Sequence, residues 1–306
     1  MSVPAVSARE LVDAPFASAL LELGRRRENV VVLSADLSKY TDVNPFAEEF
    51  PDRFFQCGMA EANMMGIAGG LAKTGLLPIA VTYGVFATRR AYDQVAMALA
   101  TGPSRGIVVA FLPGITTPFK ATHQAIDDLA LMRALPGMTV IDPADATEVG
   151  AALEAAAAAD GPVYLRGLRG QVARLFDPDG FELRAREVAA GGEIGLIGTG
   201  LGTQWALEAA GRLDGRASVL HVPTLKPLDA EAVVAYCSRF ETVATVENHS
   251  IVGGLGSAVA EALAEAGAGT RLERLGVPDR WAPAGSLDHI RSELGLDAEG
   301  IARRIG

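Results

Sequence analysis

The feature that most constrains the fold of this chain is a regular alternation of short apolar runs with longer segments of helical periodicity. In the first part of the chain, the apolar runs have the length and composition of buried strands and lie at residues 30–33, 79–82, 106–111, 138–141 and 163–165. The helical segments lie at residues 14–28, 62–73, 89–101, 126–135 and 146–159. Strands and helices that alternate in this way predict an α/β fold, in which a mostly parallel sheet carries helices on both faces.

The alternation breaks after Gly170 and then starts again. The sequence Asp177-Pro178-Asp179-Gly180 is typical of a turn. Beyond it, apolar runs and helical patterns alternate once more, at residues 194–197, 204–213, 218–222, 242–246 and 257–266. A chain of 306 residues is long enough for two domains. We therefore predict a first α/β domain over residues 1–180 and a second, smaller one over residues 181–306.

Composition and charge exclude several classes of partner. The chain has 37 acidic and 27 basic residues and a formal net charge of −10, which argues against a nucleic acid or an anionic membrane as the partner. Cys57 and Cys237 are far apart and form no CxxC pair, so we expect neither a disulfide framework nor metal ligands in this chain. The N-terminus lacks a basic region followed by an apolar core, and we therefore expect a cytoplasmic protein.

One carboxylate, Glu61, lies among small and apolar residues at the start of a predicted helix. That helix contains Gly66, Gly69 and Gly70, which permit close packing against a neighbour. A carboxyl group buried in such surroundings is a candidate for acid–base chemistry. A glutamate at the start of a helix can also face water and complement the helix dipole, and the spacing alone favours this second interpretation.

Aromatic residues and lone histidines provide further candidates for a site. Tyr83 and Phe86 follow a predicted strand, where rings can flank a flat heterocycle, although core packing is the commoner role of such rings. His123 lies in a predicted loop and His249 follows a predicted strand, and either could act as a hydrogen-bond donor or acid–base group. The segment 198–203 nearly matches a dinucleotide fingerprint but lacks its third glycine, so a nicotinamide cofactor is not favoured.

Taken together and in order, these segments resemble the C-terminal half of transketolases, which are enzymes that depend on thiamine diphosphate. The match covers nearly the whole chain, as a subunit made of a pyrimidine-binding domain and a transketolase C-terminal domain. The segments that resemble family motifs are Ser-Ala-Asp-Leu at 34–37, the Glu61 helix, the aromatic segment 83–94, Thr-His-Gln at 122–124 with 131–145, and the segments 226–229 and 246–256.

The resemblance implies a ketol transfer in which a two-carbon unit moves from a ketose to an aldose. It implies that Glu61 shares a proton with the aminopyrimidine ring of thiamine diphosphate and that His123 assists catalysis by hydrogen-bonding the substrate. It places four more residues at the cofactor and three arginines at the substrate. These are Asp36, Tyr83, Phe86 and Arg89 at the cofactor, and Arg166, Arg169 and Arg9 at the substrate.

One part of the family pattern is missing from this chain. The family holds the diphosphate through Mg²⁺ with a GDG motif and a downstream asparagine, and Asp179-Gly180 lacks both the preceding glycine and that asparagine. The resemblance therefore implies a separate N-terminal subunit that carries the diphosphate and Mg²⁺ sites. It also implies an active site formed between chains, in an α2β2 heterotetramer.

Two departures from the family pattern bear on the substrate. Phe119 falls where the family has an aspartate for a substrate hydroxyl group, and Phe111 falls near an expected phosphate-contacting histidine. The resemblance thus predicts a less hydroxylated or otherwise modified sugar, because an apolar site does not select for hydroxyl groups.

Other functions remain open. The beta subunit of a 2-oxo-acid decarboxylase or dehydrogenase shares the fold, the glutamate and the division into chains. The run Arg-Ala-Tyr-Asp-Gln at 90–94 is also close to deoxyxylulose-phosphate synthase. A non-catalytic α/β binding protein is the third alternative.

Overall fold

In the computed structural model, which describes residues 10–102 and 104–306, the alternating strands and helices form two large sheets with their covering helices, and a two-stranded sheet accompanies them. By their contacts, Glu10–Pro113 and Leu131–Leu183 form a first unit, and Gly114–Ala130 with Arg184–Gly306 form a second unit. The later division, between Leu183 and Arg184, follows the turn at residues 177–180. The sequence gives no sign that Gly114–Ala130, which includes His123, packs with the second unit.

The first unit is built on a fully parallel sheet with the strand order β6-β7-β5-β4-β2-β3. Its strands are β2 (Val30–Ser34), β3 (Phe54–Gln56), β4 (Leu77–Tyr83), β5 (Ile107–Phe111), β6 (Thr139–Ile141) and β7 (Val163–Arg166). Every residue of β2, β4, β5 and β7 is buried. The sequences of such parallel strands are continuous apolar runs, because helices cover the sheet on both faces. The predicted fold class is confirmed.

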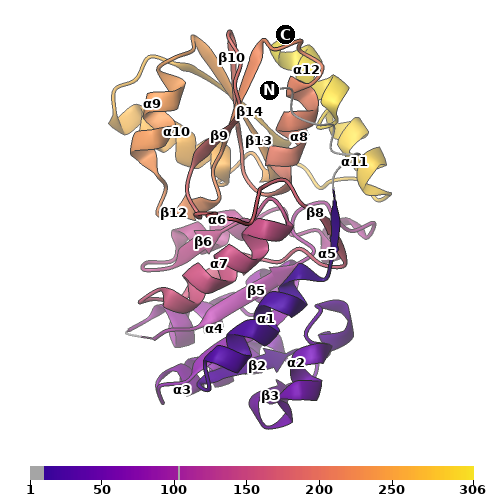
Figure 1. Ribbon diagram of the computed structural model, residues 1–306, viewed down its shortest axis with the longest axis vertical. Coiled ribbons are helices and arrows are strands. Elements are labelled where there is room, and N and C mark those ends of the chain that lie inside the picture. The colour runs from indigo at the N-terminus through magenta and orange to yellow at the C-terminus, as the bar shows by residue number, and fades with distance from the viewer. Residues whose placement is uncertain (1–9, 103) are drawn as a thin grey trace. The chain divides into compact units, whose positions relative to one another are not determined.

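The direction of the crossovers decides which helices cover which face. Right-handed connections place helices on one face when the chain moves toward β3 and on the other when it moves toward β6. The first group consists of α2 (Asn44–Glu49) and α7 (Ala146–Ala158), beside which lies α1 (Pro15–Arg26). Figure 1 shows α1 and α7 side by side in front of the sheet. The opposite face carries α3 (Glu61–Ala72) and the segment that follows β4.

That segment is helical over most of residues 89–101, as predicted, but it is not one regular α-helix. It consists of the π-helical turn η4 (Phe86–Arg90), a short α4 (Tyr92–Gln94) and a second π-helical turn η5 (Val95–Ala100). The Thr88 hydroxyl donates a hydrogen bond to the Gly84 carbonyl at 2.8 Å. A side chain that bonds back to the preceding turn competes with the helix ladder, and π-turns of this kind are frequent at functional sites.

The glycine-rich helix α3 approaches η5 closely at one position. A Cβ atom on Gly69 would lie 2.5 Å from the Ala98 carbonyl oxygen, so only glycine fits there. Close packing is therefore confirmed for Gly69. Gly66 and Gly70 are different: a Cβ atom on either would meet no described atom within 4 Å.

A buried carboxylate caps the start of α7. Asp145 is the N-cap, and its carboxylate accepts the backbone N–H of Glu148 at 2.7 Å. The same buried carboxylate also accepts the N–H groups of Leu175 and Phe176, at 2.6 and 2.8 Å. Burial raises the pKa of this carboxyl group, and the three N–H donors oppose the shift.

The second unit has its own sheet with the strand order β14-β13-β10-β11-β9. Its strands are β9 (Arg186–Ala189), β10 (Ile194–Gly198), β11 (Ala217–His221), β13 (Thr242–Ser250) and β14 (Arg271–Val277). All pairs are parallel except β11 with β9, which is antiparallel and lies at the edge. The helices are α8 (Leu201–Ala210), α9 (Ala230–Cys237), α10 (Leu255–Glu265), α11 (Leu287–Leu294) and α12 (Ala298–Ile305).

Short elements complete the chain. They are the antiparallel pair β1 (Leu11–Asp13) and β8 (Gln171–Ala173), the strand β12 (Thr224–Lys226), the turns η2 (Ser38–Tyr40) and η3 (Pro51–Arg53), and the helices α5 (Lys120–His123) and α6 (Asp128–Ala134). The segment with α5 joins the second unit through buried polar contacts. The Asn248 side chain accepts the N–H of Ile115 at 2.9 Å, and Gln124 donates to the Pro283 carbonyl at 3.0 Å.

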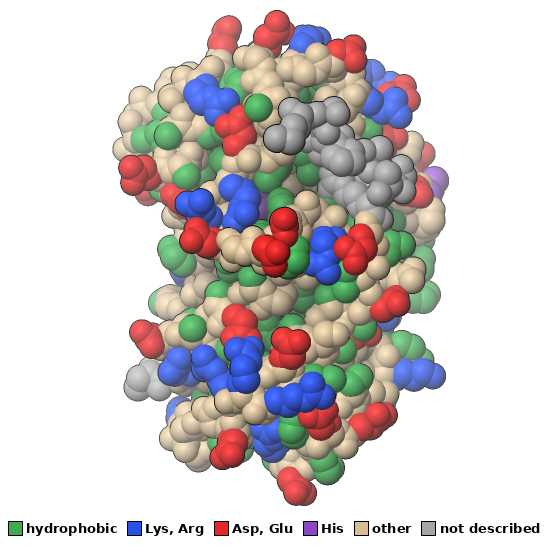
Figure 2. All heavy atoms as spheres, in the orientation of Figure 1, with side chains coloured by type: hydrophobic (Ala, Val, Ile, Leu, Met, Phe, Trp, Pro, Cys, Tyr) green, Lys and Arg blue, Asp and Glu red, His purple; other side chains and the backbone are tan. Residues whose placement is uncertain are grey.

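On the face drawn in Figure 2, acidic and basic side chains are interspersed. Within the described part of the chain, none of the helices combines the length and the apolar character that crossing a bilayer requires.

Candidate functional site

The carboxyl edge of the sheet in the first unit collects most of the residues predicted at a site. Tyr83 and Arg166 are the last residues of β4 and β7, and Asp36 follows β2. Glu61 opens α3 shortly after β3 ends. In open α/β sheets, ligands bind outside the carboxyl ends of the strands. The topology therefore brings these residues to one edge, where a ligand would be expected.

Glu61 is the buried carboxylate of this edge. Its residue exposure is 2%, so the water-facing interpretation that the spacing alone favoured is wrong. The Nη1 atom of Arg90 donates to both of its carboxylate oxygens, each at 2.9 Å. The Arg90 side chain is 50% exposed. A buried charge requires such a partner, because its desolvation is costly when it is unpaired.

The same arginine lies over an aromatic ring. Its guanidinium carbon is 4.3 Å from the centre of the Phe86 ring. Phe86 in turn stacks with Tyr83, with ring centres 5.9 Å apart and an interplanar angle of 25°. We call Glu61, Tyr83, Phe86 and Arg90 the Glu61 cluster. It combines a buried carboxylate with a pair of stacked rings.

Sequence reasoning missed Arg90 and named its neighbour Arg89 instead. Arg89 is half-buried in the same π-helical turn, η4. A signal was available, since Arg90 follows Phe86 by four positions, the spacing at which helical side chains meet. The fourth predicted cofactor residue, Asp36, is exposed and has a left-handed backbone with φ of 59°. Its N–H donates to the Gln56 side chain at 2.7 Å.

The two arginines predicted at the substrate have different surroundings. Arg166 is buried, and its guanidinium donates to the Asp142 carboxylate at 3.1 Å. This buried pair joins the ends of β6 and β7, which is a structural role, so the geometry does not support a contact between Arg166 and a substrate. Arg169 is exposed and donates to the Tyr40 carbonyl at 3.0 Å.

Arg169 also lies near the ring of Tyr83, with 6.0 Å between its guanidinium carbon and the ring centre. Burial raises the pKa of the Tyr83 hydroxyl group, and the positive charge of Arg169 opposes this shift. Tyr83 therefore stays a neutral hydrogen-bonding ring at physiological pH. The third arginine predicted at the substrate, Arg9, lies outside the described residues.

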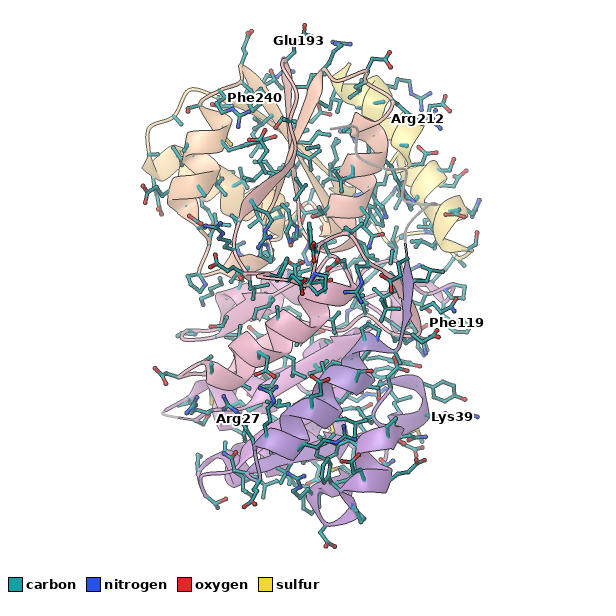
Figure 3. The ribbon with its side chains drawn as sticks, in the orientation of Figure 1. Arg27, Lys39, Phe119, Glu193, Arg212 and Phe240 are labelled. Carbon is teal, nitrogen blue, oxygen red and sulfur yellow. The ribbon has the colours of Figure 1, made fainter. Side chains whose placement is uncertain are left out.

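His123 belongs to the second unit and ends the short helix α5. Its Nδ1 atom is 3.0 Å from the Thr122 hydroxyl oxygen. The ring of Phe119 lies against it, with centres 5.1 Å apart and a tilt of 53°. Phe119 is 60% exposed, and Figure 3 shows its labelled side chain at the outer edge of the drawing. The polar group and the apolar ring are thus immediate neighbours.

Phe111 does not share this exposed position. It is fully buried and packs edge-on against Phe16, with ring centres 5.3 Å apart. A Cβ atom on Gly167 would lie 2.8 Å from the Phe111 ring. The expectation that Phe111 shapes a substrate site is therefore wrong, since its ring fills the core beneath β7.

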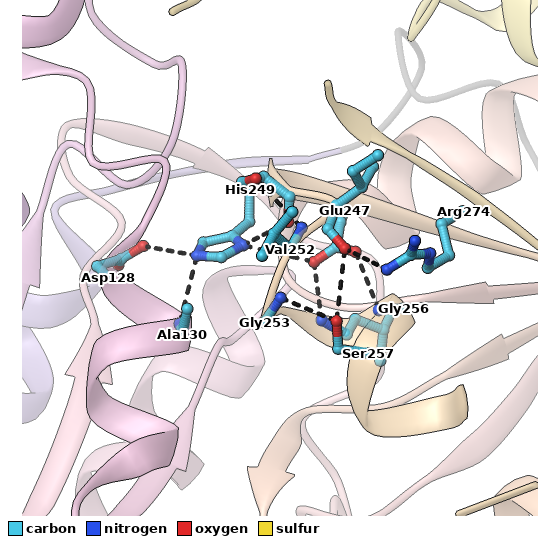
Figure 4. A network of polar contacts seen from close by, with 12 residues as sticks. Asp128, Ala130, Glu247, His249, Val252, Gly253, Gly256, Ser257 and Arg274 are labelled. Carbon is cyan, nitrogen blue, oxygen red and sulfur yellow. Dashed lines mark hydrogen bonds and ion pairs between the residues drawn. The ribbon is translucent and has the colours of Figure 1, made fainter. Parts of the chain in front are cut away.

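The other candidate histidine, His249, is structural. It is buried, and its Nδ1 donates to the Ser250 carbonyl at 2.7 Å while Nε2 lies 3.4 Å from the Ala130 N–H. Figure 4 shows this ring between Asp128 and Glu247. The Glu247 carboxylate accepts the N–H groups that open α10, at 2.7 and 2.9 Å. Together these contacts fix the starts of two helices.

Among residues 10–102 and 104–306, no group of three or more His, Cys, Asp or Glu side chains is placed to hold a metal ion.

Comparisons with known proteins cover nearly the whole chain. Residues 12–173 match the family model described as "Transketolase, pyrimidine binding domain", and residues 183–301 match "Transketolase, C-terminal domain". A transketolase family protein of Sinorhizobium fredii is 44% identical over 300 residues, which is 95% of this chain and 87% of that protein. The 6-deoxy-6-sulfo-D-fructose transketolase subunit of a Clostridium species is 39% identical over 94% of this chain and 91% of that subunit.

A solved structure described as "Split gene transketolase, inactive beta4 tetramer" has a TM-score of 0.85 and 39% identity, over 94% of this chain and 95% of that one. Similarity also extends to 1-deoxy-D-xylulose-5-phosphate synthases, of whose length the chain spans about half.

Proposed function

Because the chain belongs to the transketolase family, we propose that it is the pyrimidine-binding subunit of a split, thiamine-diphosphate-dependent transketolase. It acts with a separate diphosphate-binding subunit to move a two-carbon ketol unit from a ketose to an aldose. The observation that carries this proposal is the buried Glu61 carboxylate beside the stacked rings of Tyr83 and Phe86.

The Glu61 cluster fits an aminopyrimidine. The Arg90 guanidinium, a flat group with N–H donors, already lies on the Phe86 ring and bonds to the Glu61 carboxylate. An aminopyrimidine is also flat and can hydrogen-bond to a carboxyl group through a ring nitrogen. The guanidinium thus stands in for the kind of group that the cluster would hold.

When bound, thiamine diphosphate supplies the carbon nucleophile for breaking the bond beside a ketone. Glu61 holds the pyrimidine by a hydrogen bond to a ring nitrogen and shares a proton there. Tyr83 and Phe86 orient the ring and exclude water from it. Arg89 lies in the same turn as Phe86, and Asp36 follows β2 at the same edge of the sheet; we place both at the cofactor. Arg169 binds the anionic end of the sugar, a task suited to a guanidinium group. His123 hydrogen-bonds an oxygen atom of the substrate.

The partner chain supplies the diphosphate and Mg²⁺ sites in this proposal. Two relatives support it through their descriptions, one as a "transketolase subunit" and one as a "split gene transketolase". Two-fold assembly of both chains gives an α2β2 heterotetramer, which would operate in the cytoplasm.

A reaction of the deoxyxylulose-phosphate-synthase type is the second candidate, favoured by the similarity to those synthases. A donor screen with the co-purified pair of chains and thiamine diphosphate separates the candidates. Transfer from a ketose to an aldose, with no use of pyruvate or another 2-oxo acid, supports the transketolase. Consumption of a 2-oxo acid in its place would favour a synthase or a 2-oxo-acid decarboxylase.

Phe119 is the residue that we propose to shape the choice of sugar. Its exposed ring beside His123 offers an apolar contact where a polar one would select a hydroxyl group. A relative is named for 6-deoxy-6-sulfo-D-fructose, which is a modified sugar. We expect this chain to use a modified or less hydroxylated sugar in preference to the ordinary pair, xylulose 5-phosphate with ribose 5-phosphate.

Changing Phe119 to Asp should shift this preference toward the ordinary sugars by about tenfold, because it restores a group that can accept a hydrogen bond from a hydroxyl. The measurement compares kcat/KM for both kinds of sugar in the reconstituted pair. Val252→Asp, an exposed apolar position in the same unit, is the control and should leave the ratio unchanged. A wild-type preference for the ordinary pair that Phe119→Asp does not alter would contradict the proposal.

A further inference from the structure

We propose that Arg90 occupies the place of the cofactor's aminopyrimidine on the unassembled chain, and that its guanidinium must swing away before the ring can bind. This inference rests on the proposed function and concerns the same Glu61 cluster. It assigns to Arg90 the role of a placeholder.

The geometry shows one planar group making two contacts at once. The Arg90 guanidinium bonds to both Glu61 oxygens at 2.9 Å, and its carbon lies 4.3 Å from the centre of the Phe86 ring. A heterocycle that stacks on Phe86 while it bonds to Glu61 needs the same two contacts. The guanidinium and the heterocycle therefore exclude each other.

Burial explains why a placeholder is needed. Glu61 is 2% exposed, and a buried carboxylate without a partner is strongly disfavoured. The ion pair with Arg90 satisfies Glu61 before any cofactor arrives. A ring nitrogen that shares a proton with the carboxyl group would be its replacement.

Exposure explains how the placeholder can leave. Half of the Arg90 side chain is exposed, so its charge can return to water when the guanidinium moves. Its backbone belongs to the π-helical turn η4, while Glu61 is fixed on α3. The exchange therefore needs only a rotation of the arginine side chain.

The consequence is a lowered affinity of the free chain for the pyrimidine. A ligand that binds only the open arrangement has its apparent affinity reduced by the fraction of molecules that are open. Charge-assisted hydrogen bonds to a buried carboxylate are strong enough to make that fraction small. The free chain would thus have a low affinity for the cofactor until the partner subunit adds the binding energy of its contacts with the diphosphate.

The test measures binding of the pyrimidine half alone, 4-amino-5-hydroxymethyl-2-methylpyrimidine, to the free chain by ligand-observed NMR titration. Arg90→Met removes the charged, planar guanidinium group but keeps an unbranched apolar stem. We expect it to bind the probe about tenfold more tightly than the wild type. Arg90→Lys keeps a charge that cannot stack in the same way, and should give an intermediate affinity.

Arg25→Met is the matched control. Arg25 pairs with Glu49 at 2.6 Å on the surface of the same unit, and its loss should leave probe binding unchanged. Arg90→Gln is a second variant that keeps a hydrogen-bond donor for Glu61 in case Arg90→Met does not fold. Equal or weaker binding by folded Arg90 variants, or no saturable binding up to the solubility limit of the probe, would overturn the inference.

Failure of the inference and failure of the proposed function give different results. Ketol transfer by the assembled pair, without tighter probe binding by Arg90 variants, would contradict only the proposed role of Arg90. Tighter probe binding by the variants, without ketol transfer by any assembled pair, would support the role of Arg90 and contradict the proposed transketolase function.

Discussion

Replacing Glu61 by glutamine is expected to lower ketol transfer by the assembled enzyme at least about a hundredfold, the scale of a positioned acid–base group. Glutamine has nearly the same shape and can still hydrogen-bond to a ring nitrogen. It cannot share a proton with that nitrogen as a carboxyl group does. The measurement is kcat/KM with the partner chain and saturating thiamine diphosphate, together with the rate at which the C2 proton of the bound cofactor exchanges with solvent.

The control is Glu49→Gln in the same unit. Glu49 also pairs with an arginine but lies on the surface, where such pairs contribute little to stability. This variant should keep near-normal turnover, and both variants should assemble with the partner as the wild type does. If Glu61→Gln kept normal turnover and normal proton exchange, the catalytic role of Glu61 would be wrong.

Replacing Arg166 by methionine is expected to destabilise the free chain by about 3–5 kcal/mol, because it leaves the Asp142 carboxylate buried without its guanidinium partner. Both side chains of this pair are almost fully buried, at 1% and 3% exposure. The free energy of unfolding from urea denaturation measures the effect. Changing both residues, to Arg166→Met and Asp142→Leu, should recover much of the loss, since no charge then stays buried.

Arg169→Met is the contrasting variant. Arg169 is exposed, so its loss should change the free energy of unfolding by less than about 1 kcal/mol. We expect a raised KM for an anionic sugar instead, since Arg169 is the arginine that we propose at the substrate. Unchanged stability of Arg166→Met, combined with a raised KM, would restore the substrate role that the family resemblance implies for Arg166.

Local sequence patterns predicted the core of the fold, because a buried strand and a helix cap are each recognisable from a few neighbouring residues. The buried strands β2, β4, β5 and β7 are continuous apolar runs, and Asp145 caps α7 as its sequence indicates. Short or half-exposed elements such as β3 and β9 left no comparable signal. Residues 89–101 were predicted as a helix, but apolar periodicity does not distinguish the π-helical turns found there from a regular α-helix.

The candidate site was predictable where family motifs fall on strand ends. It was harder to predict where the role of a residue depends on whether its side chain is buried. Sequence alone did not distinguish a buried from an exposed Glu61, since both occur at helix starts. Burial also separates the two phenylalanines that looked alike as departures from the family pattern: Phe119 is exposed beside His123, whereas Phe111 fills the core. Arg90 was missed although it follows Phe86 at helical spacing, and the structure places its guanidinium between that ring and the Glu61 carboxylate.

Whether this chain is half of a composite active site is tested most directly by a mixing experiment. Thiamine-diphosphate-dependent ketol transfer is measured for the chain alone, for an N-terminal subunit carrying the GDG motif alone, and for the two together. We expect no measurable transfer by either chain, and transfer by the mixture that saturates as one chain is titrated with the other. Ketol transfer by the purified chain in the absence of any partner would contradict the division of the active site between two subunits.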